Sequence, residues 1–315
     1  WTLRQPTQIV RSPAGVSMDT LVLASSAGGR LTGFIRAPVQ QPARIHLRAD
    51  AVPLADVGRL AQLASPLDGL LTVDFTAAGT RDQPTIRLDA AARGVKYDAF
   101  SAEAFTLVGD YANERAKLQA NVLRGGRSVL DGFVDYPIAI TLFSAQATGD
   151  SLRGRIHADS VDLALIEPFA PKLRNAAGGL GLDLAVSGVP AQPHVGGTAS
   201  VRDGAFEIPD AGIHFTAIDG LFHVNAASDS LSIDHLRLAS PASNGTASLS
   251  GSLVYRDLAN PKLDLRFDSH ALRVVDKRDL ARLDVSTGSN GLTLIGTPAE
   301  ATMRGAINVD RGTIY

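Results

Sequence analysis

Three aspartates recur at one fixed spacing: Asp50, Asp159 and Asp268 are each separated from the next by 109 residues. Carboxylates repeated in this way could ligate calcium, as in acidic repeat solenoids, or cap exposed backbone N–H groups. No Asp-rich nonapeptide accompanies them. We therefore expect these carboxylates to cap turns or the start of a following helix.

Basic side chains recur just before the aspartates. They are Arg44, Arg153 and Lys262, followed by Arg48, His157 and Arg266. Their alternation with apolar residues predicts that they lie on a solvated strand face. The histidines show no zinc-binding spacing, so we predict no metal site.

Catalytic motifs are absent from the sequence. It contains no Gly-x-Ser-x-Gly elbow, no phosphate-binding loop and no dinucleotide fingerprint. No nucleophile can be paired with a base. We predict that the chain is not an enzyme and needs no cofactor.

The amino-acid composition argues against several classes of protein. The 315 residues carry a net charge of −2, which gives no bulk attraction to nucleic acid. No apolar run reaches the roughly 18 residues of a membrane helix, and the absence of cysteine excludes disulfides and thiolate chemistry. Because the chain starts at Trp1 and stops inside a repeated motif at Tyr315, we expect a piece of a longer polypeptide.

Most segments alternate apolar and polar residues, which predicts β-strands with one apolar and one wet face. Residues 262–268 are the clearest case. Turn signals such as Gly125-Gly126, Asp203-Gly204 and Asp219-Gly220 separate the segments. The pattern favours an antiparallel meander and a mainly all-β fold.

The period of 109 residues defines the expected organisation. We predict one continuous array in which 1–32 ends a preceding repeat, 33–131 is repeat 1, 132–250 is repeat 2, and 251–315 is a partial repeat 3. A helical spacing of apolar residues also predicts one short helix in each repeat, over 54–64, 163–173 and 274–283.

A sheet with one apolar face must cover it, because large exposed apolar patches are rare in monomers. The sheet could fold into a dry sandwich, close into a barrel, or remain an open trough that holds something apolar. Small aliphatic residues favour the extended, curved trough. We expect nine side chains to line its apolar groove: Leu47, Val73, Phe75, Leu88, Ile156, Leu182, Leu184, Leu265 and Phe267.

Several motifs resemble the AsmA-like superfamily and, within it, the TamB-type subunit of the translocation and assembly module. The resemblance rests on residues 188–193 leading to 197–209, on the parallel run 294–298 with 305–315, and on 249–255. It is a pattern of Gly, Pro and alternating aliphatics, and it spans all three copies. Ala301 departs from it, since a proline is expected there.

The resemblance implies a periplasmic protein with a hydrophobic β-trough, anchored to the inner membrane by a helix that this chain lacks. It implies a role in moving phospholipids between the inner and outer membranes, with phospholipid acyl chains as the bound partner. An outer-membrane β-barrel is a further implied partner. Two alternatives stay open: a factor that templates strands of outer-membrane proteins, and an extracellular β-solenoid adhesin with a dry core.

Overall fold

The computed structural model describes residues 1–62, 66–80, 82–97, 100–141, 144–164, 170, 172–255 and 260–315. The chain divides into two compact units. Unit 1 comprises residues 1–156 and 186–193, and unit 2 comprises residues 157–185 and 194–315. Strands β12, β13 and β14 contribute residues to both units.

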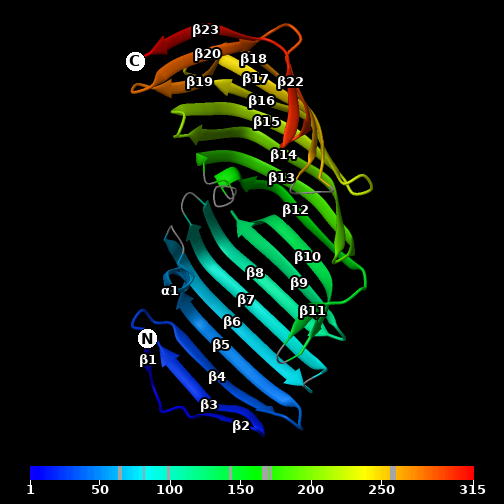
Figure 1. The fold of residues 1–315 in the computed structure, drawn as a ribbon. Coiled ribbons are helices and arrows are strands. Elements are labelled where there is room, and N and C mark those ends of the chain that lie inside the picture. The colour runs from blue at the N-terminus through cyan, green and yellow to red at the C-terminus, as the bar shows by residue number, and fades with distance from the viewer. Residues whose placement is uncertain are drawn as a thin grey trace. The chain divides into compact units, whose positions relative to one another are not determined.

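Unit 1 is an antiparallel meander in which each strand from β3 to β10 pairs with the next along the chain (Figure 1). Its elements are β1 (Thr2–Leu3), β2 (Ile9–Ser12), β3 (Gly15–Ala24), β4 (Arg30–Pro38), β5 (Ala43–Pro53), α1 (Leu54–Leu60), β6 (Leu67–Gly79), β7 (Pro84–Tyr97), β8 (Phe100–Ala112), β9 (Arg115–Arg124), β10 (Arg127–Ile140), β11 (Ala145–Ala147) and the start of β12 (Leu152–Asp162).

Unit 2 has the same antiparallel pattern from β14 through β18, which pairs in turn with β21, and β21 with β22. A separate sheet joins β19, β20 and β23. The elements are β13 (Arg174–Val189), β14 (Gln192–Ile208), β15 (Ile213–Asn225), β16 (Ser230–Ser240), β17 (Gly245–Val254), β18 (Lys262–His270), β19 (Leu272–Lys277), β20 (Ala281–Thr287), β21 (Leu292–Thr297), β22 (Glu300–Arg304) and β23 (Ile307–Ile314).

The prediction of a mainly all-β fold with an open, curved antiparallel sheet is confirmed. Shifts of register between Ala49 and Val52 in β5, and between Thr216 and Asp219 in β15, mark bulges. Bulges bend a strand and increase its twist.

The structure agrees with the three predicted helices only in part. The first is confirmed as α1, which is shorter than expected. The second lies largely outside the described residues. The third is wrong, because residues 274–283 belong to β19, a turn and β20. Val274 and Val275 are β-branched and suit a strand, where β20 supplies the backbone hydrogen-bond partners.

Two predicted turns are also wrong. Asp203-Gly204 lies inside β14 and Asp219-Gly220 inside β15. Register shifts occur at both places. Residues that permit a positive φ serve bulges as well as hairpins, and Asp203 has φ 49°.

Candidate functional site

The apolar face of unit 1 is a set of side-chain rows that run across the strands. Residues paired directly across strands share a face. One row is formed by Gly33, Leu47, Phe75, Leu88, Gly109, Leu118 and Val134. The next row is formed by Leu31, Ala49, Val73, Ala90, Leu107, Ala120 and Gly132. We call the face that carries these rows the groove face.

Unit 2 has a groove face of the same kind. One row contains Ala199, Phe222, Ile233, Gly251, Leu265 and Leu294. The neighbouring row contains Val201, Gly220, Leu236, Leu249, Phe267 and Leu292. Each unit thus presents parallel apolar rows several strands long.

The structure brings the predicted groove residues of unit 1 together. Leu47, Phe75 and Leu88 are consecutive members of one row, and Val73 lies in the next. Ile156 neighbours that second row, since a Cβ on Gly132 would lie 3.6 Å from the Ile156 Cα. All of these side chains are half-buried.

The predicted groove residues of unit 2 fall into two environments. Leu265 lies in the first row, and Leu184 lies beside Gly197, whose Cβ would be 3.0 Å from the Leu184 Cα. Leu182 is half-buried two residues earlier in β13, on the same strand face. Phe267 instead packs against a buried cluster formed by Ile213, Phe215, Ile218, Ala247 and Leu272. The groove-lining role of all nine residues stays a prediction.

The opposite face of each sheet, which we call the ion-pair face, carries the charges. In every repeat a basic residue pairs with the aspartate two positions later. The pairs are Arg48–Asp50 (3.0 Å), His157–Asp159 (3.1 Å) and Arg266–Asp268 (3.0 Å). The hydrogen bond to Asp268 raises the pKa of Arg266, and the charge of that carboxylate adds to the rise. The basic positions therefore lie on a wet face, as predicted.

The expected capping role of these aspartates finds no support at the helix that the structure describes. The N-cap of α1 is Pro53, and no side chain caps it. Asp50 lies three residues earlier and accepts from the Arg48 guanidinium. The spacing in the sequence showed that each aspartate precedes a predicted helix. It could not show that the aspartate would instead bind the basic side chain two positions earlier on the same strand face.

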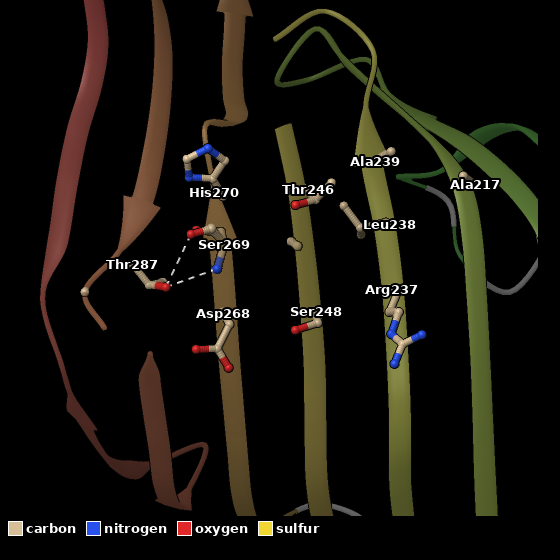
Figure 2. A pocket seen from close by; sticks show the side chains of 12 residues that line it. Ala217, Arg237, Leu238, Ala239, Thr246, Ser248, Asp268, Ser269, His270 and Thr287 are labelled. Carbon is tan, nitrogen blue, oxygen red and sulfur yellow. Dashed lines mark hydrogen bonds between the residues drawn. The ribbon is translucent and has the colours of Figure 1, made fainter. Parts of the chain in front are cut away.

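A surface hollow of about 530 Å³ lies in unit 2 (Figure 2). Arg237, Ser248 and Asp268 follow one another across three strands on its polar side. The Thr287 hydroxyl accepts from the Ser269 N–H at 3.1 Å and donates to the Ser269 carbonyl at 3.4 Å. This pair ties β20 to β18. It is a structural contact, and the described lining offers no paired nucleophile and base.

The described residues contain no group of three or more His, Cys, Asp or Glu side chains able to hold a metal ion. Nor does any helix in this part of the chain have the length and apolar character needed to cross a membrane.

Residues 234–315 match the model of the TamB C-terminal domain. This match supports a TamB-type protein fragment. This part of the chain includes the C-terminal half of the unit 2 groove face and the three-stranded sheet. No curated protein and no solved structure shows a significant match.

The TamB family is a transport and assembly family and not a family of enzymes. The match supports a role in TamB-like translocation or transport and in outer-membrane biogenesis.

Proposed function

We propose that the groove face carries phospholipid acyl chains, so that the chain forms part of a periplasmic bridge between the inner and outer membranes. The observation that carries this proposal is the run of apolar rows across β4–β10. Their side chains are half-exposed and belong to one face. On this proposal the anchor to the inner membrane lies outside the present sequence.

The packing of unit 1 supports an accessible groove face. Elements in extensive contact there are paired neighbouring strands, together with α1 on β5 and β6. Leu118 in the first row remains 37% exposed. An acyl chain could therefore lie along the row with its methylenes against aliphatic side chains.

The energetics favour such a path. A lipid that crosses water exposes its acyl methylenes at a cost of about 0.8 kcal/mol for each CH₂. A continuous apolar row removes much of that cost without any chemical step. The charges of the opposite, ion-pair face pair with one another, as in Arg48–Asp50, Arg87–Asp89 and Arg266–Asp268.

Charged substitutions on the groove face test the proposal. Leu184→Glu and Leu265→Glu in the full-length protein should lower phospholipid transfer between the membranes at least about tenfold, because a carboxylate must be desolvated by the passing chains. Lys262→Glu is the matched control, since Lys262 lies on the opposite face of the same strand as Leu265.

The measurement is the transfer of pulse-labelled phospholipid in cells, with circular dichroism to confirm folding. Normal transfer by folded Leu184→Glu and Leu265→Glu proteins contradicts the proposal.

Strand templating for outer-membrane proteins is the second candidate. It is favoured by β22, which in the described residues pairs only with β21 and is exposed along its length. Unpaired strand edges recruit added strands. Mass spectrometry of the purified protein separates the two candidates: bound phospholipid favours transport, whereas bound unfolded barrel protein without lipid favours templating.

A further inference from the structure

The three-stranded sheet of unit 2 is made by strands that break and continue outside the main sheet. Strand β18 runs into β19 after a break at Ala271, where φ is 45°. Residues 288–291 separate β20 from β21 in the same way, and Gly305-Ala306 separates β22 from β23. One half of each long strand belongs to the main sheet, and the other half belongs to the second sheet.

The folded-over halves cover part of the groove face. Strand β19 packs across β15, β16 and β17, and β20 packs against β18. Leu272 is 4% exposed and lies in the cluster with Ile213, Phe215 and Ile218. Val274 and Phe267 pack against that cluster. The chain's own side chains thus occupy the space that an acyl chain would fill.

Polar contacts fix the second sheet in place. The buried Arg273 guanidinium donates to Asp284 and Asp276, and it also donates to the Ala242 carbonyl at 3.3 Å. The Asp276 N–H donates to the Ala211 carbonyl at 2.9 Å. These bonds join the second sheet to the turns that follow β14 and β16. The cover is therefore a built part of unit 2.

We propose that this sheet seals one side of the unit 2 groove against acyl chains, so that lipid passes along the row of Phe222 and Leu265 but not along Phe215 and Phe267. This inference rests on the proposed lipid path. It adds a boundary to that path, drawn by residues 272–287 and 307–314.

Four phenylalanines provide a matched test. Each is replaced in the full-length protein by the photo-crosslinking analogue p-benzoylphenylalanine: Phe75 in unit 1, Phe222 in the open row, and Phe215 and Phe267 in the sealed region. Cells labelled with ³²P-phosphate are irradiated, and label on the purified protein is measured. We expect phospholipid adducts at Phe75 and Phe222, and at least tenfold less label at Phe215 and Phe267.

The outcomes separate the two proposals. Absence of label at all four positions contradicts the lipid path itself. Label at Phe75 together with equal label at Phe215 or Phe267 overturns the seal, and label at Phe75 alone overturns the lipid path along Phe222.

Folding of the substituted proteins is read from the same experiment. At Phe215 and Phe267 the analogue should crosslink to peptides from β19 or β20, which peptide mapping detects. Lack of both lipid and internal adducts at these positions overturns the packed arrangement.

Discussion

At the scale of single residues, Asp135 is the most enclosed acid of the unit 1 ion-pair face. It is 6% exposed and accepts from the Arg115 guanidinium at 2.8 Å, with Arg153 at 3.5 Å. The hydrogen bond from Arg115 lowers the pKa of Asp135 even though burial opposes the shift. The other pairs of this face are more exposed and contribute little each.

Asp135→Asn should therefore change both stability and its pH dependence. A carboxylate whose pKa is lowered on folding stabilises the fold above its unfolded value near 3.8, and this contribution disappears as the pH falls through the folded value. We expect the variant to lose about 1–3 kcal/mol at pH 7. The difference from the native protein should shrink below pH 3.8.

Urea titrations between pH 7 and 3 measure this effect, with the exposed Asp131→Asn as control. A deficit that stays constant over this range contradicts the assignment.

The strand face on which a residue lies could be predicted from the sequence, but the packing over that face could not. The period of two placed Leu47, Phe75 and Leu88 on one face, because alternation fixes the face of a strand. It could not show that Phe267 would pack against the buried cluster of unit 2 while Leu265 stayed in the open row. That difference depends on β19, a strand that the local spacing of residues 274–283 predicted as a helix.

At the scale of elements, Gly69 of β6 allows α1 and β7 to approach the strand closely. Gly69 has φ 124° and sits at a register shift in β6. A Cβ there would lie 2.8 Å from the Arg93 carbonyl oxygen and 3.0 Å from Leu54 Cδ1 of α1. On β7, Gly94 has φ 60° with open space around the same position.

Gly69→Ala should destabilise the protein by about 3 kcal/mol, because it combines backbone strain with a collision between strands. Gly94→Ala should cost about 1–2 kcal/mol, since only the left-handed backbone is disfavoured. Thermal unfolding compares the two variants. Equal losses contradict the role given to close approach at Gly69.

At the scale of the whole molecule, the two units bury their apolar surface differently. Unit 2 gathers Ile213, Phe215, Ile218 and Leu272 into one cluster beneath its second sheet. The groove-face rows of unit 1 remain half-buried. A ligand that binds only the native state stabilises it by mass action. Apolar ligands should therefore act mainly on the open rows, which make up the groove face of unit 1.

Hydrogen exchange with a short-chain phosphatidylethanolamine, held below its micelle concentration, examines this asymmetry. At 100 times the Kd, binding contributes about 2.7 kcal/mol, so exchange through global opening should slow about a hundredfold in β5–β8. The covering strands β19 and β20 should change little, because side chains of β19 already pack in the buried cluster. The headgroup without acyl chains is the control. Equal slowing in both sets of strands, or slowing by the headgroup alone, contradicts an acyl-chain path on the groove face of unit 1.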